Sequence, residues 1–389
     1  MKELREIVEG WDALRERREP VLLATVVATR GSTYRRPGAR LLLSAERWVA
    51  GGISGGCLER DVLTKAWWRT ADGPRVVVYD STSADDEETW TFGLGCNGVV
   101  EVLLERLPDG GETHPLDFIA ERLRSRRPGV LVTVFRAEPG AAASVGQRLL
   151  LDERGVRTDL PPGPLQRALL ADAEGVLRSG QGHTVRHALD GAPVEALLEA
   201  IRPPRSLVVF GNGQDAVPLV RMASALGFQV TVVADSPAGV PAELFREAHA
   251  RIAATPWAMA GKLTLEPDGA CVVMTHNLAH DTGFLRFALA SDCPYVGVLG
   301  PRLRTERLLQ SLRDEGFSIG EAEMRRLFAP VGLDLGADEP EEIALAILAE
   351  IQVVFGSAEG GSLRERQGPI HPRPPESAPP PSNPGRIAG

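Results

Sequence analysis

Hydrophobic residues recur with two different periods along this chain. Residues 4–14 carry an apolar stripe at helical spacing, and Pro20 ends the helix that this stripe predicts. The apolar runs 21–29 and 41–43 have the character of strands, and a turn rich in glycine and arginine separates them. The chain is therefore expected to begin with a helix followed by strand, turn and strand.

The strand-turn-strand pattern returns 108 residues later. Residues 131–134 lead through Gly140 into Gly146-Gln147-Arg148-Leu149-Leu150-Leu151, which aligns with Gly38-Ala39-Arg40-Leu41-Leu42-Leu43. Self-similarity at a fixed separation indicates an internal duplication. Only the first copy continues into a glycine-rich loop with a cysteine, so we expect the chemistry in the first copy and a supporting role for the second.

From residue 206 the pattern changes to short buried strands alternating with helices. Strands are predicted at 207–210, 229–233, 270–274 and 295–299, and helical periodicity follows the first, third and fourth of them. Residues 338–351 form a last helix with Asp338 and Glu341 placed for a capping box. Such alternation is typical of a parallel, doubly wound sheet.

These patterns predict an α/β protein with four parts. Residues 1–107 form an N-terminal α+β domain that carries the glycine and cysteine loop, and a second, degenerate copy at 108–203 packs on it. A Rossmann-like doubly wound parallel sheet with its C-terminal helix covers 204–355. The proline-rich segment 356–389 holds too few large apolar side chains to offset the entropy of ordering, so we expect it to be a disordered tail.

Composition narrows the classes of partner and compartment. A net charge of −9 with a pI near 5.5 argues against nucleic acid or anionic lipid, because both require clustered basic residues. No apolar run approaches the roughly 20 residues that cross a bilayer, so we expect no membrane insertion and a cytoplasmic location. The four cysteines form no Cys-x-x-Cys pair, and any functional one is expected to act as a thiol.

A glycine turn opens the second half at Gly211-Asn212-Gly213. It follows a predicted strand and opens a helix, and Asp235 ends the next strand, which is the context of a dinucleotide-binding fingerprint. Gly211 would permit the tight turn, Gly213 would admit a pyrophosphate to the backbone amides, and Asp235 would accept a ribose hydroxyl. His276, just after the strand predicted at 270–274, is a candidate for ligand contact or for a helix-capping role. The same glycines would equally serve close packing of helix on strand without that ligand.

A second glycine loop, Gly51-Gly52-Ile53-Ser54-Gly55-Gly56-Cys57-Leu58-Glu59, precedes an apparent helix over 58–68. Such a loop can direct consecutive amides into one concavity, and a cysteine at a helix start is a candidate nucleophile or soft metal ligand. Cys96, in Gly93-Leu94-Gly95-Cys96, repeats this logic, although a small buried hydrophobe is an equal interpretation there. Arg35, Arg36 and Arg40 precede the loop and are candidates for holding phosphate, or for lying on a solvated turn.

Taken together these segments resemble the XdhC/CoxI family, the accessory proteins that mature molybdenum hydroxylases such as xanthine dehydrogenase. The resemblance covers most of the chain and is most specific over Ile53 to Glu59. The other matching segments are Gly31-Ser32 with Arg36-Pro37-Gly38-Ala39, Gly93-Leu94-Gly95-Cys96, Gly211-x-Gly213, Tyr295-Val296-Gly297-Val298-Leu299-Gly300, and Pro330-Val331-Gly332-Leu333-Asp334-Leu335-Gly336 with Pro340-Glu341-Glu342-Ile343-Ala344.

The resemblance implies a chaperone rather than an enzyme. Such a protein binds the molybdenum cofactor, molybdopterin or its dinucleotide form, shields it during sulfuration by a cysteine desulfurase, and delivers it to an apo molybdenum hydroxylase. It would act as a homodimer, with Cys57 nearest the molybdenum. The residues expected to hold the cofactor are Arg36, Ser54, Gly55, Gly56, Cys57, Glu59, Cys96, Gly211, Gly213, Asp235 and His276.

Two other functions share parts of this pattern. An NAD(P)-dependent oxidoreductase with a cysteine-bearing substrate domain would use the same fold, but it needs a proton donor beside the nicotinamide, and His276 is the one candidate. A scaffold that docks two proteins, with the proline-rich tail as a peptide ligand, would explain neither glycine loop.

Overall fold

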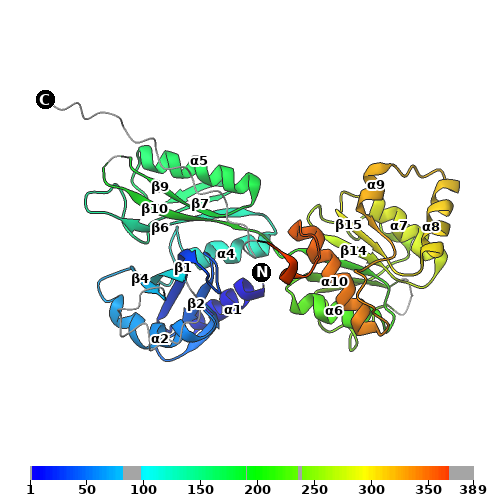
Figure 1. The fold of residues 1–389 in the computed structure, drawn as a ribbon, viewed down its shortest axis with the longest axis horizontal. Helices are drawn as coiled ribbons and strands as arrows, with labels where there is room; N and C mark the ends of the chain where they lie inside the picture. The colour runs from blue at the N-terminus through cyan, green and yellow to red at the C-terminus, as the bar shows by residue number, and fades with distance from the viewer. Residues whose placement is uncertain (1, 82–97, 190, 235–238, 368–389) are drawn as a thin grey trace. The chain divides into compact units, whose positions relative to one another are not determined.

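The computed structural model describes residues 2–81, 98–189, 191–234 and 239–367. The described chain separates into two compact units, one of residues 3–203 and one of Lys2 with residues 204–367. We call them the N-terminal unit and the Rossmann unit, and Figure 1 shows the elements of each.

The N-terminal unit contains one set of elements twice. Its described residues form two antiparallel five-stranded sheets, with strand orders β3-β2-β1-β5-β4 and β8-β7-β6-β10-β9, which are the same order in the two copies. The first copy comprises α1 (Lys2–Glu16), β1 (Val21–Gly31), β2 (Arg40–Leu43), β3 (Trp48–Gly51), α2 (Cys57–Arg69), β4 (Arg75–Asp80) and β5 (Gly98–Leu107). The second comprises α4 (Pro115–Ser125), β6 (Gly129–Ala137), β7 (Arg148–Asp152), β8 (Gly155–Thr158), α5 (Pro164–Ser179), β9 (His183–His187) and β10 (Val194–Ile201). The duplicated strand-turn-strand unit is thus confirmed.

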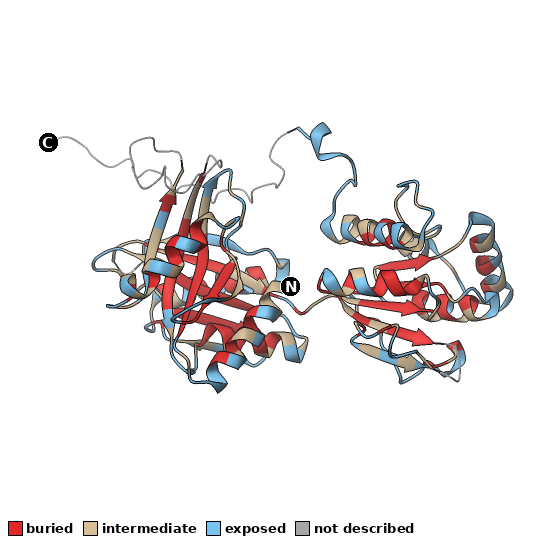
Figure 2. Cartoon of the chain, turned by 90° about the horizontal axis from the view of Figure 1, so that it is seen from below, coloured by how far each residue is buried: buried red, intermediate tan, exposed pale blue. Residues whose placement is uncertain are grey.

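Each sheet of the N-terminal unit is covered on both faces. On its outer face α2 packs Leu58 and Val62 onto the first sheet, and α5 covers the second in the same way. Between the sheets lies a shared core in which Leu23 of β1 and Leu131 of β6 belong to one cluster with Trp11 of α1. Buried residues accordingly concentrate on the strands in Figure 2. The apolar stripe of the first helix faces this shared core, as its spacing predicts.

Two reciprocal ion pairs join the copies. Arg40 of β2 binds Glu199 of β10, with Nη1 and Nη2 lying 3.0 and 2.6 Å from the carboxylate oxygens, and Arg148 of β7 binds Glu105 of β5. The separation of the two arginines, 148 − 40 = 108, is the repeat itself. The two glutamates also occupy equivalent positions in the strand register: Glu105 lies opposite Leu23 of β1, and Glu199 lies opposite Leu131 of β6. The two copies within this chain therefore contact each other through equivalent residues, as the two subunits of an isologous dimer do.

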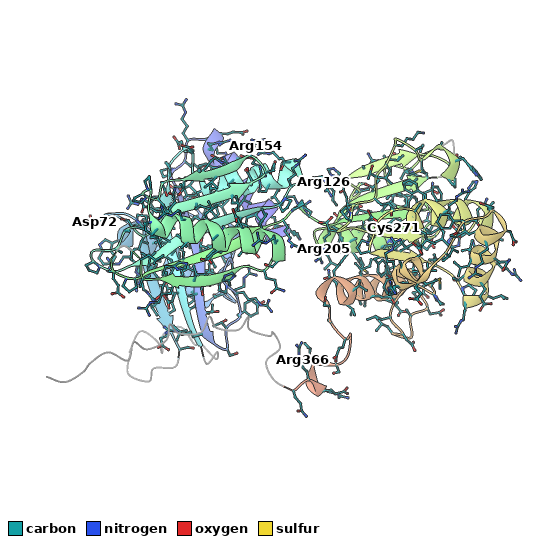
Figure 3. All side chains as sticks on the ribbon, turned by 90° about the horizontal axis from the view of Figure 1, so that it is seen from above. Asp72, Arg126, Arg154, Arg205, Cys271 and Arg366 are labelled. Carbon is teal, nitrogen blue, oxygen red and sulfur yellow. The ribbon has the colours of Figure 1, made fainter. Side chains whose placement is uncertain are left out.

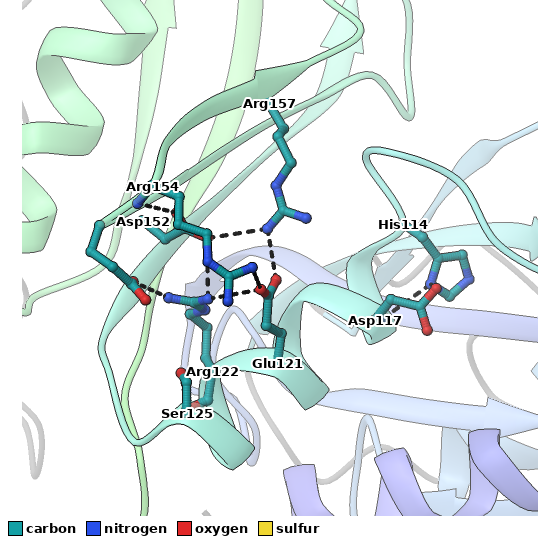
Figure 4. Close-up of polar contacts among 9 residues, drawn as sticks. His114, Asp117, Glu121, Arg122, Ser125, Asp152, Arg154 and Arg157 are labelled. Carbon is teal, nitrogen blue, oxygen red and sulfur yellow. Dashed lines mark hydrogen bonds and ion pairs between the residues drawn. The ribbon is translucent and has the colours of Figure 1, made fainter.

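A buried histidine lies beside one of these pairs. His114 is the N-cap of α4, where Nδ1 accepts a hydrogen bond of 3.1 Å from the Asp117 amide (Figure 4), and its ring stacks on Trp11. Its Nε2 has no hydrogen-bond partner in the described part of the chain. Burial lowers the pKa of His114 below the ordinary 6.5; Asp117 and Glu105 oppose the shift and Arg148 adds to it.

This histidine makes the stability of the N-terminal unit depend on pH. Below pH 6.5 the imidazole of His114 is protonated in the unfolded protein but stays neutral in the folded protein. The free energy of unfolding therefore falls as pH decreases, by at most about 1.4 kcal/mol per pH unit. His114→Asn removes the titration and keeps an N-cap acceptor. Urea unfolding at pH 7.5 and 5.5 should show a smaller loss of stability in the variant. Equal losses in both proteins would exclude His114 as the cause.

The Rossmann unit is a parallel sheet with helices on both faces. Its described strands take the order β13-β12-β11-β14-β15-β16, and the β11–β14 neighbourhood is the point where the chain reverses its direction across the sheet. Helices α6 and α10 share one core cluster with the sheet, and α7 and α8 share the other. The strands are β11 (Ser206–Phe210), β12 (Gln229–Ala234), β13 (Ala250–Ala253), β14 (Ala270–Val273), β15 (Tyr295–Val298) and β16 (Leu327–Phe328). The helices are α6 (Ala216–Ala225), η1 (Pro256–Ala258), α7 (Leu278–Leu289), α8 (Arg302–Asp314), α9 (Glu321–Arg326), α10 (Pro340–Gly356) and η2 (Leu363–Glu365).

The Rossmann unit departs from the sequence prediction in three places. β16, with only two residues, is not among the predicted strands. β13 is not among the predicted strands, because its four residues alternate weakly and contain an arginine. The predicted capping box of the last helix is one residue early: the N-cap is Glu339 and its partner is Glu342. Pro340 explains the shift, since proline is favoured as the first residue of a helix and restricts the residue before it to extended backbone. Residues 368–389 of the predicted tail lie outside the described residues.

Candidate functional site

The glycine and cysteine loop connects β3 to α2 and places Cys57 at the first residue of the helix. Gly56 is the N-cap and has φ +115°, a conformation that a residue with a side chain rarely adopts. Gly51, where the loop begins, has φ +77°, and a Cβ there would lie 2.2 Å from the carbonyl oxygen of Arg40. Cys57 is half-buried at the helix N-terminus, where it packs in part against the core of the first sheet.

Ser54 organises the loop around the cysteine. Its Oγ accepts hydrogen bonds from the amides of Gly56 and Leu58, at 3.0 and 3.1 Å, and lies 3.5 Å from the Cys57 sulfur. The same hydroxyl donates to a carboxylate oxygen of Glu59. Ser54 therefore supplies the helix cap that Gly56, with no side chain, cannot give.

Glu59 anchors the loop from beneath. It is only 4% exposed, and Oε1 accepts from the amides of Ile53 and Ser54 at 2.9 and 2.7 Å. Burial alone would raise the pKa of Glu59, but these bonds and the Ser54 hydroxyl hold it below the ordinary 4.5, so the group is a carboxylate at neutral pH. Because both of its oxygens serve the loop, we infer that Glu59 positions Cys57 and does not itself contact a ligand.

The three candidate arginines separate into different roles. Arg40 is 2% exposed and bound to Glu199, and Arg35 is paired with Glu3, so neither is placed to hold phosphate as the sequence suggested. Arg36 is exposed and forms no ion pair with any described residue. It is therefore the arginine of this turn that a phosphate can reach.

Tyr34 belongs to the same site but is not among the residues predicted from the sequence. It is 72% exposed, and its ring lies 4.0 Å from the point where a Cβ on Gly55 would stand. The turn that carries Arg36 and the cysteine loop are thus neighbours, with an open aromatic ring between them. The sequence signal that could have indicated Tyr34 is its position as an aromatic residue between Arg30 and Arg35, on a turn bounded by two glycines.

The remaining cysteines differ from Cys57. Cys271, in β14 (Figure 3), and Cys293 are completely buried in the Rossmann core, where the Cys293 thiol donates to the carbonyls of Gly269 and Tyr295. They behave as small core residues. Cys96 and Asp235, both predicted to contact the cofactor, lie outside the described residues.

The glycine turn of the Rossmann unit has the geometry of a close backbone approach. Gly211 has φ +138°, and a Cβ on it would lie 2.5 Å from the carbonyl oxygen of Met274. A Cβ on Gly213 would lie 2.5 Å from Oδ1 of Asp215 and 3.9 Å from the His276 ring. The turn and the loop after β14 therefore meet at the carboxyl edge of the sheet, where ligands of such sheets bind.

His276 is tied to this turn by a hydrogen bond. Its Nε2 lies 2.8 Å from Oδ2 of Asp215, its side chain is 63% exposed, and its φ of +62° places it in the left-handed region. The helix-capping role is not its own, because Asn277 is the N-cap of α7 and accepts from the amides of Ala279 and His280. His276 thus stays accessible at the ligand edge.

A buried carboxylate holds the loop that carries His276. Asp281 is 1% exposed, and its Oδ1 accepts from the amide and hydroxyl of Thr275 at 3.0 and 2.7 Å. Its Oδ2 binds Arg304 of α8 at 2.6 Å. The ends of β14 and β15 are thereby fixed relative to each other.

Metal-binding clusters and membrane-spanning helices are both absent from the described ranges. Three or more histidine, cysteine or carboxylate side chains nowhere converge there as a set able to hold a metal ion. Over the same residues, every helix is too short or too polar to span a bilayer.

Family models match both halves of the chain. A model of the XdhC Rossmann domain matches residues 207–351. A model of the XdhC and CoxI family matches twice, at 14–80 and 122–188, and the two matches are again separated by 108 residues.

Similar proteins of known name span nearly the whole chain. A Bacillus subtilis protein, named as a probable component of xanthine dehydrogenase, is 33% identical over 344 residues, which is 87% of this chain and 94% of that protein. The molybdenum cofactor insertion chaperone PaoD of Escherichia coli is 25% identical over 335 residues, 86% of this chain and 83% of PaoD.

A crystal structure extends the likeness to the fold. It is described as that of a xanthine dehydrogenase from Bacillus halodurans, shares 30% identity with this chain, and superposes with a TM-score of 0.72 over 92% of this chain and 98% of its own. Together with the two family models, these likenesses show that the chain belongs to the XdhC and CoxI family.

Proposed function

We propose that this protein binds the molybdenum cofactor and delivers it to a molybdenum hydroxylase of the xanthine dehydrogenase type. The observation that carries the proposal is the thiol of Cys57, half-buried at a helix start and held there by Ser54 and Glu59. The relatives support it by name: one is a molybdenum cofactor insertion chaperone and one a probable component of xanthine dehydrogenase.

The chemistry of the loop suits this cargo. A cysteine sulfur is a soft ligand of the kind that molybdenum accepts. Arg36, free of described ion pairs, can bind the cofactor's phosphate through a bidentate contact. Tyr34 offers an open ring against which a flat pterin can lie.

The finer steps follow from the same proposal. The loop shields the bound cofactor while a cysteine desulfurase supplies sulfur, and the protein acts in the cytoplasm as a homodimer that recognises the apo-hydroxylase. In the Rossmann unit, the turn at Gly211 and Gly213 binds a nucleotide. The proposal also includes Cys96 and Asp235, which the sequence predicts to contact the cofactor.

The decisive experiment measures the cofactor on the purified protein. The chain is isolated from cells that make molybdopterin, and bound molybdenum and oxidisable pterin are assayed. Cys57→Ala is expected to lose at least about tenfold of the bound molybdenum, because a direct ligand is removed. Cys271→Ala, which alters a core thiol, is the control and should retain the cofactor if it folds.

An NAD(P)-dependent oxidoreductase is the second candidate, because His276, hydrogen-bonded to Asp215, stands at the glycine turn as an accessible proton donor. In that case the protein would carry no molybdenum, would bind NADPH and turn it over, and Cys57→Ala would leave binding unchanged. Those results together would replace the chaperone by the oxidoreductase.

A further inference from the structure

A tryptophan stands open at the carboxyl edge of the Rossmann sheet. Trp257 lies in η1, directly after β13, and is 72% exposed. Its ring meets that of His280, in the first turn of α7, edge to face at 5.5 Å and 77°. The ring therefore lies at the edge where sheets of this kind bind ligands.

The position of the ring is fixed by packing beneath it. Pro256 is buried against Gly283 of α7, where a Cβ on the glycine would lie 2.5 Å from the Pro256 side chain. Met259, on the other side of Trp257, is 1% exposed and belongs to the core shared with α7 and α8. Both neighbours are thus anchored, and the tryptophan between them is held outward.

A continuous series of contacts joins this ring to the glycine turn. The Asn212 side chain donates to the carbonyl of Gly239 at 3.3 Å, and a Cβ on Gly239 would lie 3.9 Å from Ala253, the last residue of β13. Lys262 donates from Nζ to the carbonyl of Ala253 at 3.4 Å. The turn, the cation and the segment that carries Trp257 therefore adjoin one another along one edge.

We propose that Trp257, His280 and Lys262 form the subsite for the base and phosphate of a nucleotide, so that the ligand class is a nucleoside diphosphate. The inference rests on the proposed function, in which the glycine turn of the Rossmann unit binds a nucleotide. The base stacks on Trp257 beside His280, the Lys262 ammonium meets the phosphates, and the amides at Gly213 complete the anion site.

The surroundings of the ring favour a small ligand over a docked protein. The exposed residues that follow Trp257 are Ala258, Ala260, Gly261 and Lys262, which add almost no apolar surface. A protein interface would require a wider core of buried apolar contacts around such an anchor. A single ring with a cation beside it suffices for a base and its phosphate.

The test is calorimetric titration of the full chain with ADP, with GDP and with inorganic pyrophosphate. Trp257→Ala should weaken ADP and GDP by about tenfold or more, because stacking on an aromatic ring contributes that much per base. Pyrophosphate binding should change less than about twofold, since it has no base to stack. Trp257→Phe should retain most of the affinity for both nucleotides, and Lys262→Ala should weaken all three ligands.

Trp68→Ala is the matched control, because Trp68 is 78% exposed but lies in the N-terminal unit. Unchanged ADP and GDP binding in Trp257→Ala, or no binding by the wild-type chain, would overturn the subsite. Cys57→Ala separates the two proposals: it should bind ADP normally while losing molybdenum. A variant that keeps molybdenum and binds ADP would refute the role of Cys57 and leave the nucleotide subsite standing.

Discussion

Replacing Arg148 by methionine is expected to lower the free energy of unfolding of the N-terminal unit by about 3–5 kcal/mol, because it leaves a buried carboxylate without its partner. Glu105, the partner, is only 3% exposed, and Arg148 also donates to the carbonyl of Gly146 at 3.0 Å. Urea unfolding followed by tryptophan fluorescence measures this loss. Five of the six tryptophans, at positions 11, 48, 67, 68 and 90, lie before residue 204, so the signal reports mainly on this unit.

An exposed pair between the same two copies supplies the control. Arg124 of α4 binds Asp12 of α1 at 2.8 Å with its side chain 65% exposed, so Arg124→Met should cost less than about 1 kcal/mol. Adding Glu105→Leu to Arg148→Met should restore much of the lost stability, because no unpaired charge then remains in the interior. Equal, small effects of Arg148→Met and Arg124→Met would show that the reciprocal pairs do not hold the copies together.

Glu59→Ala is expected to dismantle the cysteine loop. The substitution removes the acceptor of three hydrogen bonds, from Ile53, Ser54 and the Ser54 hydroxyl, and should cost about 2–4 kcal/mol. Because Cys57 is the proposed ligand of the cofactor and its thiol is no longer held in place, the molybdenum bound by Glu59→Ala should fall nearly to the level of Cys57→Ala. Metal analysis of the purified variant tests this, with ADP titration as the check that the Rossmann unit is intact.

Two variants separate positioning from a general loss of structure. Arg60→Ala changes an exposed residue at the next position of α2 and should alter neither stability nor molybdenum. Glu59→Gln keeps Oε1 as an acceptor for the two amides and should retain an intermediate amount of molybdenum. Full retention by Glu59→Ala would show that the loop does not depend on this carboxylate to present Cys57.

Local pattern was sufficient for most of the fold. The apolar stripe of the first helix, the strand runs of both copies and the alternation of the Rossmann unit are all set by residues close together in sequence, which a period of 3.6 or 2 reveals. The 108-residue separation also comes from sequence alone, because the two copies preserve the same residues at the same turns. β13 escaped detection since four residues offer too little periodicity.

The sequence by itself thus determined the first helix, the strand-turn-strand unit and its duplication, the alternation of the Rossmann unit, the glycine turn and the thiol at the start of α2. Only the tertiary structure decided which charged side chains are free to bind a ligand. Arg40 and Arg36 look alike in sequence, yet Arg40 meets Glu199, 159 residues away, and Arg36 meets no described carboxylate. Similarly, Glu59 accepts hydrogen bonds from the cysteine loop, and His276 is hydrogen-bonded to Asp215. The physical reason is that burial and ion pairing are properties of contacts between distant segments, which periodicity along the chain cannot encode.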